Sequence, residues 1–138
     1  MDRPLDIPVS ECMSTPLRTV TPDLPVGAAA EVLRQERIGS VVVTDEAGDI
    51  AGIVTESDMV RSVGADHDTD RMTVDRLMTK DVVTIGLDAT LKTACDRMAE
   101  HDVKRLPVVA EEPVGIVTTT DLTHELAQSF SDTLAPLE

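Results

Sequence analysis

The chain has 138 residues, which is enough for one compact domain or for two small interlocked ones. Its 26 acidic residues against 12 basic ones give a net charge of −14, which disfavours nonspecific nucleic-acid binding, because that binding relies on lysine and arginine at the phosphates. No apolar run approaches the roughly 20 residues that cross a bilayer, and the N-terminal residues lack the pattern of a signal peptide. We therefore expect a cytoplasmic protein with no membrane contact.

The first half of the chain predicts three strands and two helices, followed by a polar, loop-like stretch. In order, these are a strand at 17–20, a helix whose apolar face is Val26, Ala29, Ala30 and Leu33, strands at 40–43 and 50–55, and a helix at 57–63. The helical face follows the i, i+3, i+4, i+7 spacing, and the β-branched residues of the second strand are typical of a buried strand.

The second half predicts the same elements in the same order. They are a strand at 82–85, a helix whose apolar face is Leu91, Ala94, Cys95 and Met98, strands at 106–109 and 114–118, and a helix at 120–128. This order indicates an internal repeat, which decides the architecture.

The two halves align residue by residue, with one change of register. At an offset of 65 residues, Cys12-Met13-Ser14 aligns with Leu77-Met78-Thr79. Later the offset becomes 63, and Gly52-Ile53-Val54-Thr55 aligns with Gly115-Ile116-Val117-Thr118. The slip falls at 45–49 in one half and at 111–113 in the other, where a predicted turn tolerates a change of length.

The repeat predicts an α/β (α+β) fold of two β-α-β-β-α units that pair about a pseudo-two-fold axis into one module. Neither unit alone buries both faces of so small a sheet. The predicted boundaries are 7–65 and 72–130 for the units, 66–71 for the linker and 131–138 for a C-terminal tail.

Two segments that run from a strand into a helix end in Thr-x-x-Asp, at Thr55 and Asp58 and at Thr118 and Asp121. One interpretation is structural: each threonine caps its helix and each aspartate completes a box that resembles a capping box. The other is functional. A helix N-terminus favours phosphate, and a carboxylate can accept both hydroxyls of a ribose. The occurrence of the pair at matching places in a repeat favours a paired site.

Three motifs together resemble the CBS domain pair, or Bateman module. They are Gly-hydrophobic-x-Thr-x-x-Asp at the close of each half, Val-x-x-x-Met at the opening (Val9 to Met13; Val74 to Met78), and Lys104-Arg105-Leu106-Pro107-Val108-Val109. The resemblance covers residues 7–130 and implies two ligand clefts, each built from the opening segment and second strand of one copy and the threonine and aspartate of the other.

Carried over to this sequence, the resemblance implies the following sites. The first cleft holds Thr55, Asp58, Thr79, Lys80, Val82, Lys104, Arg105 and Pro107, and the second holds Thr15, Pro16, Leu17, Gly39, Ser40, Thr118 and Asp121. Only the first has a pair of cations for phosphate, because Gly39 and Ser40 align with Lys104 and Arg105. We therefore predict that the first cleft is the better nucleotide site.

The resemblance implies a stand-alone regulatory sensor of AMP, ADP, ATP or S-adenosylmethionine that needs no cofactor and signals to an unidentified partner protein. The alternative is a ligand-free assembly module. Its last helix carries Leu122, Leu126 and Phe130, which could dock on a second chain. A homodimer is expected in either case, because family members commonly dimerise through such helices.

We do not expect an enzyme or a metal site. Cys12 and Cys95 are interpreted as small buried hydrophobes, and His67, His101 and His124 show no ligand spacing. The acidic residues are spread along the whole chain and are interpreted as a surface property. They predict a protein of a salt-rich cytosol, such as that of a haloarchaeon, where salt screens their repulsion.

Overall fold

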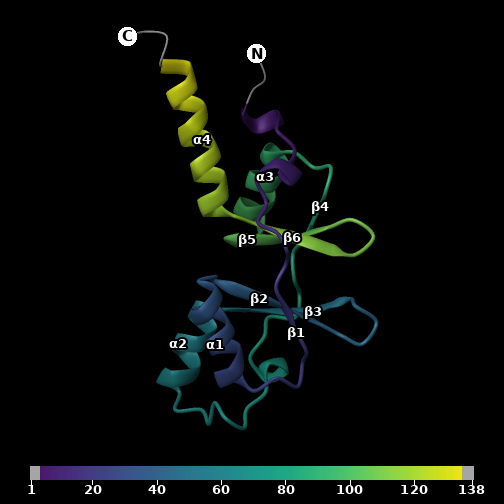
Figure 1. Ribbon diagram of the computed structural model, residues 1–138, viewed down its shortest axis with the longest axis vertical. Helices are drawn as coiled ribbons and strands as arrows, with labels where there is room; N and C mark the ends of the chain where they lie inside the picture. Colours follow the sequence, from purple (N-terminus) through teal and green to yellow (C-terminus); the bar gives the residue numbers. More distant parts are fainter. Residues whose placement is uncertain (1–3, 135–138) are drawn as a thin grey trace. The chain divides into compact units, whose positions relative to one another are not determined.

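The computed structural model describes the backbone of residues 4–134 and the side chains of residues 5–129 (Figure 1). The chain divides into two compact units. The continuous unit is Leu17–Val82, and the discontinuous unit joins Met1–Pro16 to Val83–Glu138. The opening segment of each sequence repeat therefore belongs to the unit that the body of the other repeat forms. The predicted tail overlaps the last helix, and residues 135–138 lie outside the described part of the chain.

The continuous unit has a three-stranded sheet, two α-helices and one 3-10 turn. These are β1 (Thr19–Val20), α1 (Val26–Glu36), β2 (Ser40–Thr44), β3 (Ile50–Thr55), α2 (Glu56–Gly64) and η3 (Val74–Arg76). The strand order is β1-β2-β3, with β1 parallel to β2 and β2 antiparallel to β3. η3 comes from the opening segment of the second repeat.

The discontinuous unit has the same arrangement and a longer final helix. Its elements are η1 (Pro4–Asp6), η2 (Val9–Glu11), β4 (Ile85–Gly86), α3 (Leu91–His101), β5 (Arg105–Val109), β6 (Pro113–Thr118) and α4 (Thr119–Leu134). The order β4-β5-β6 again combines one parallel and one antiparallel pairing. The predicted fold class and the duplicated β-α-β-β-α order are thus confirmed.

The two hairpins explain the change of register in the sequence repeat. Five residues, 45–49, connect β2 to β3, and three residues, 110–112, connect β5 to β6. In the longer turn, Gly48 has φ +87°, a conformation that favours glycine, and Oδ1 of Asp45 accepts from the backbone N–H groups of Ala47 and Asp49, both at 3.0 Å. The two-residue slip is therefore confined to a turn, as predicted.

Two predictions for the elements need correction, and one kind of element was not predicted. The first strand of each unit has two residues, and in β4 it begins one position later in the repeat than in β1. Pro107 accounts for that difference, because the N–H of Val42, its equivalent, donates to the carbonyl of Arg18 at 3.1 Å and proline has no N–H. The last helix is longer than 120–128, and the 3-10 turns of the opening segments were not foreseen.

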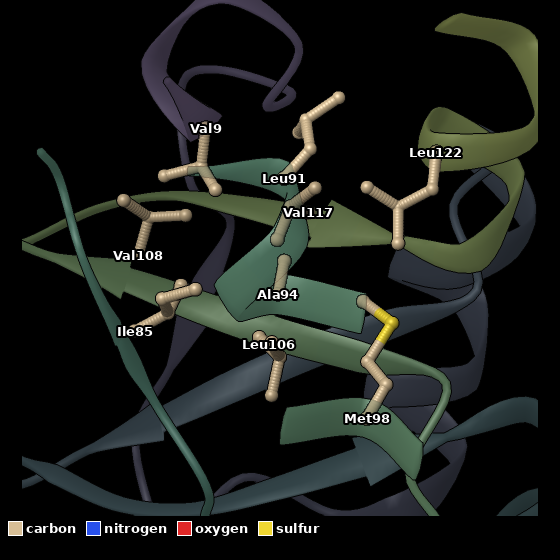
Figure 2. Packing of buried hydrophobic residues seen from close by; sticks show 9 residues of the cluster. All are labelled: Val9, Ile85, Leu91, Ala94, Met98, Leu106, Val108, Val117 and Leu122. Atoms are coloured by element: carbon tan, nitrogen blue, oxygen red, sulfur yellow. The ribbon is translucent and has the colours of Figure 1, made fainter. Parts of the chain in front are cut away.

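Each unit has its own aliphatic core. In the continuous unit, the core residues are Val26, Ala29, Leu33, Val41, Val43, Val54 and Val74. In the discontinuous unit they are Val9, Ile85, Leu91, Ala94, Met98, Leu106, Val108, Val117 and Leu122 (Figure 2). The predicted helical faces at 26–33 and 91–98 are those that pack on the sheets. The opening segments contribute Val74 to one core and Val9 to the other, and so belong structurally to these units.

One of the three residues of the predicted docking face on the last helix is buried within its own unit. Leu122 is only 6% exposed and lies in the core of its own unit (Figure 2), so it is not available to a second chain. Leu126 is half-buried, and the side chain of Phe130 lies outside the described part of the chain. Within residues 4–134, no helix combines the length and apolar character needed to cross a membrane.

Candidate functional site

The two Thr-x-x-Asp motifs start helices with the same hydrogen bonds. In α2, the N–H of Thr55 donates to Oδ2 of Asp58 at 2.8 Å, and the N–H of Asp58 donates to the Thr55 hydroxyl at 3.3 Å. In α4, the N–H of Thr118 donates to Oδ2 of Asp121 at 2.8 Å, and the N–H of Asp121 donates to the Thr118 hydroxyl at 3.2 Å. The reciprocal bonds of a capping box are present in both, so the structural interpretation of these residues is confirmed.

The aspartates of these motifs differ from nearly all other acidic residues in burial. Among acidic side chains in residues 5–129, all are exposed except those of Asp58, Asp121 and Glu125. Asp58 is only 4% exposed, and Asp121 and Glu125 are half-buried. The acidity is therefore a surface property, as predicted. Moving a carboxylate out of water costs free energy unless the charge is paired. We therefore interpret the reduced exposure of Asp58 and Asp121 as a specific feature of the fold.

The partners of the two carboxylates are not the same. Oδ1 of Asp58 forms an ion pair with the guanidinium of Arg61, and Oδ2 also accepts from the Thr55 hydroxyl at 3.1 Å. The repeat equivalent of Arg61 is His124. Within the described side chains, Oδ1 of Asp121 has no hydrogen-bond or ion-pair partner. Arg61 is not among the predicted site residues, although its i, i+3 spacing from Asp58 predicts such a pair on a helix.

The opening segment of one repeat crosses the third strand of the other, next to each helix start. Ile53 and Thr79 exchange backbone hydrogen bonds of 3.0 Å, and Ser14 and Ile116 exchange bonds of 2.8 and 3.2 Å. A Cβ on Gly52 would lie 2.9 Å from the carbonyl oxygen of Thr79, and a Cβ on Gly115 would lie 2.9 Å from that of Ser14. The motif glycines are therefore required by this close crossing, a role that the sequence did not reveal.

The entrance to the central strand lies beside the helix start in each unit. The N–H of Glu56 donates to the carbonyl of Gly39 at 3.1 Å, and the N–H of Thr119 donates to that of Lys104 at 2.9 Å. Ser40 is the register partner of Thr55, and Arg105 is that of Thr118. Lys104 and Arg105 thus flank the helix start of α4 within the discontinuous unit.

Arg105 also stands out by its hydrogen bonding. Its Nε is buried and has no hydrogen-bond partner among the described residues, whereas Lys104 is exposed. Buried polar atoms normally find a partner, so this unpaired donor is a notable feature of the entrance to β5.

Each predicted cleft draws its residues from both units. Of the first cleft, Thr55, Asp58, Thr79, Lys80 and Val82 belong to the continuous unit, and Lys104, Arg105 and Pro107 belong to the discontinuous unit. Of the second cleft, Thr15, Pro16, Thr118 and Asp121 belong to the discontinuous unit, and Leu17, Gly39 and Ser40 belong to the continuous unit. The structure thus brings together the threonine, the aspartate and the opening segment of each cleft. The grouping of these residues with those of the other unit stays a prediction.

The cysteines and histidines of the described residues take part in no cluster suited to a metal ion. No cluster of three or more His, Cys, Asp or Glu side chains suited to a metal ion occurs within those residues. Cys12 and Cys95 are free thiols, both half-buried. Burial raises the pKa of the Cys12 thiol to about 11 and also raises the pKa of Cys95, so that few thiolates form at neutral pH. Both pack beside the core of their unit, in agreement with the interpretation as small hydrophobes.

The fold and the duplicated motif agree with the protein family whose model matches the sequence. The model of the CBS domain matches twice, at residues 9–65 and 74–128. The chain belongs to the CBS domain family and contains a pair of these domains.

Several relatives match most of the chain. An uncharacterised 17.7 kDa protein of Acidianus ambivalens is 32% identical over 120 residues, which are 86% of this chain and 72% of that protein. The CBS domain-containing protein YhcV of Bacillus subtilis is 30% identical over 115 residues, which are 83% of this chain and 81% of that protein.

Solved structures of similar chains show the same fold. A conserved protein of unknown function from Pyrococcus horikoshii superposes with a TM-score of 0.80 at 30% identity, covering 90% of this chain and 93% of that one. The CBS domain pair of the protein MJ0100, in complex with 5′-methylthioadenosine and S-adenosyl-L-methionine, gives 0.81 at 25% identity, covering 88% and 97%. The CBS domain pair is a regulatory module rather than a catalytic one.

Proposed function

We propose that this chain is a regulatory module that binds an adenine-containing ligand, AMP, ADP, ATP or S-adenosylmethionine, and transmits its ligand state to a partner protein. The observation that carries the proposal is the pair of Thr–Asp helix starts, where Asp58 is buried and Asp121 is half-buried, whereas nearly all other described acidic side chains are exposed. Support comes from the CBS domain pair of MJ0100, which was solved with two adenosine derivatives.

The geometry of a helix start suits such a ligand. The first N–H groups of a helix and its partial positive charge favour a phosphate or a carboxylate. The aspartate can accept the hydroxyls of a ribose cis-diol, and the threonine hydroxyl can donate to the ligand. Lys104 and Arg105 would add affinity for phosphates through charge-assisted hydrogen bonds. We therefore expect nucleoside phosphates to benefit from these two cations more than S-adenosylmethionine does.

Regulation requires that the ligand prefer one conformation of the module over another. Each Thr–Asp pair lies beside an opening segment contributed by the other repeat, so a ligand held there touches chain from both repeats. A partner protein would read the resulting change. The cytoplasmic location and the salt-rich environment remain predictions from the sequence.

The proposal is tested by calorimetric titration with AMP, ADP, ATP and S-adenosylmethionine in concentrated KCl. We expect saturable binding of at least one ligand, weakened in Asp58→Asn and in Asp121→Asn. Asparagine retains a capping oxygen and removes the carboxylate, so these variants separate binding from helix capping. Glu111→Gln removes an exposed charge of the same sign and should bind like the unsubstituted chain. Absence of saturable binding for all four ligands would contradict the proposal.

A second candidate function, assembly with a second copy of this chain, is favoured by the surface of α2. Val60 and Val63 are each 71% exposed there, the largest exposure among the large apolar side chains of residues 5–129. Ala30, Leu33 and Met59 line a hollow of about 300 Å³ beside Val60. Sedimentation equilibrium distinguishes this candidate: a dimer that dissociates in Val60→Asp would support it, and a monomer at all concentrations would exclude it.

A further inference from the structure

The two Thr–Asp helix starts differ chemically because Arg61 is present on only one of the two helices. It lies one turn beyond Asp58 on α2, and its guanidinium forms an ion pair with Oδ1 of that aspartate. The equivalent residue of α4 is His124, and no ion pair to Asp121 occurs within the side chains of residues 5–129. Asp58 therefore has a cationic partner from its own helix, and among the described side chains Asp121 has none.

The hydrogen bonds of Asp58 leave little of its carboxylate for a ligand. Oδ2 accepts from the N–H of Thr55 at 2.8 Å and from its hydroxyl at 3.1 Å, while Oδ1 is held by Arg61. The side chain of Asp58 is only 5% exposed. A ribose cis-diol needs free acceptor positions on the carboxylate. A ligand at Asp58 must therefore displace Arg61 or share the oxygen with it.

The carboxylate of Asp121 is engaged on one oxygen only. Its Oδ2 accepts from the N–H of Thr118 at 2.8 Å, and within the described residues Oδ1 accepts no hydrogen bond. The Thr118 hydroxyl accepts from the N–H of Asp121, and its own proton is donated to no described group, unlike that of Thr55. Both groups of this helix start are thus free to meet a ligand.

We infer that Arg61 competes with the ligand for Oδ1 of Asp58, which makes Arg61 an affinity-determining residue of that site. The inference rests on the function proposed above. The Arg61 side chain is 68% exposed, and an ion pair with so exposed a partner is weak. Its removal should therefore tighten binding at Asp58 by roughly twofold to fivefold rather than by orders of magnitude.

The test uses an Asp121→Asn background, in which the remaining binding reports on Asp58. Arg61→Gln is added, and ATP and S-adenosylmethionine are titrated by calorimetry at the lowest KCl concentration that keeps the chain folded. We expect the dissociation constant to fall roughly twofold to fivefold. Arg34→Gln is the matched control, because Arg34 forms an i, i+3 ion pair with Glu31 on α1 and is 71% exposed. An unchanged or weaker affinity in Arg61→Gln would overturn the inference.

The titrations distinguish a failure of this inference from a failure of the proposed function. If the unsubstituted chain binds none of the ligands, the proposed function and the inference both fail. If it binds and Arg61→Gln does not tighten the site, the inference alone fails. A measurement on the unsubstituted chain avoids any effect on folding: the side-chain Nε–H resonance of Arg61 should shift on saturation, while that of Arg34 stays in place. A resonance of Arg61 that does not move on saturation would also overturn the inference.

Discussion

The continuous and discontinuous units have the same topology and strand register, and each has one capping box, yet they differ at the residues that could contact a ligand. At the start of α2 the carboxylate of Asp58 is buried and paired with Arg61, whereas at the start of α4 Asp121 is half-buried and one of its oxygens has no partner among the described residues. The strand entrance carries Gly39 and Ser40 in one unit and Lys104 and Arg105 in the other. A duplicated backbone therefore supports two chemically unequal sites, because the capping bonds preserve the helix starts while the flanking side chains vary.

The largest expected effect on the free energy of unfolding comes from a substitution in the core of one unit, which can be compared with the equivalent substitution in the other. Leu106→Ala should lower the free energy of unfolding by about 2–5 kcal/mol, because a fully buried leucine is lost and leaves a cavity. Its repeat equivalent is Val41, and Val41→Ala should have a smaller effect because fewer buried atoms are removed. Urea denaturation measures both. An equal loss would contradict the account of the discontinuous core, and Val60→Ala, at an exposed position, serves as the control.

The crossing of the opening segments should be equally sensitive in the two units. Gly52→Ala and Gly115→Ala should each destabilise the fold by about 1–3 kcal/mol, since the added Cβ meets the carbonyl oxygen of Thr79 or of Ser14. Gly64 is the matched control, because nothing lies within 4 Å of a Cβ placed there. A loss in Gly64→Ala as large as in the other two, measured by urea denaturation, would show that the crossings are not the cause.

The capping threonine of α2 should contribute more to stability than the capping threonine of α4. Thr55→Ala should cost about 0.5–2 kcal/mol of stability, and Thr118→Ala should lie nearer the lower end of that range. The reason is that the Thr55 hydroxyl also donates to the buried Asp58, whereas the Thr118 hydroxyl donates to no described group. Thermal unfolding of the two variants measures the difference. A greater loss in Thr118→Ala would contradict the comparison.

The smallest expected difference concerns salt. The discontinuous unit has 13 acidic and 5 basic residues, and the continuous unit has 13 acidic and 7 basic ones. Raising KCl screens like-charge repulsion, so the melting temperature should rise and amide exchange should slow in both units, more so in the discontinuous one. Hydrogen exchange at low and high KCl measures this by unit. A chain that is most stable in dilute buffer would contradict the prediction of a salt-rich environment.

Periodicity and turn chemistry were sufficient to predict the architecture from the sequence. The helical faces at 26–33 and 91–98, the register slip at the hairpins and the caps at Thr55 and Thr118 all follow from local patterns, and the structure confirms them. Local patterns do not show which unit an opening segment joins, because the segment pairs with residues that are far apart from it in the chain. The bridges of Ser14 with Ile116 and of Thr79 with Ile53 are such pairings.

The candidate site was only partly predictable for a similar reason. The sequence marked Asp58 and Asp121 as equivalent, but their burial and partners depend on tertiary packing and on one neighbour. Arg61 lies three residues after Asp58, a spacing that predicts an ion pair on a helix, and yet it is not among the predicted site residues. Leu122 was assigned to a docking face because it is apolar on a terminal helix, yet it fills the core of its own unit. An apolar residue on a helix predicts burial without saying against what.

The central claim, that the two Thr–Asp helix starts bind an adenine-containing ligand, is tested most directly by backbone amide chemical shifts during separate titrations with AMP, ADP, ATP and S-adenosylmethionine. The account predicts that the largest shifts fall at residues 55–58 and 118–121, with saturation at both. Shifts that are largest elsewhere, or that fail to saturate with all four ligands, would contradict it.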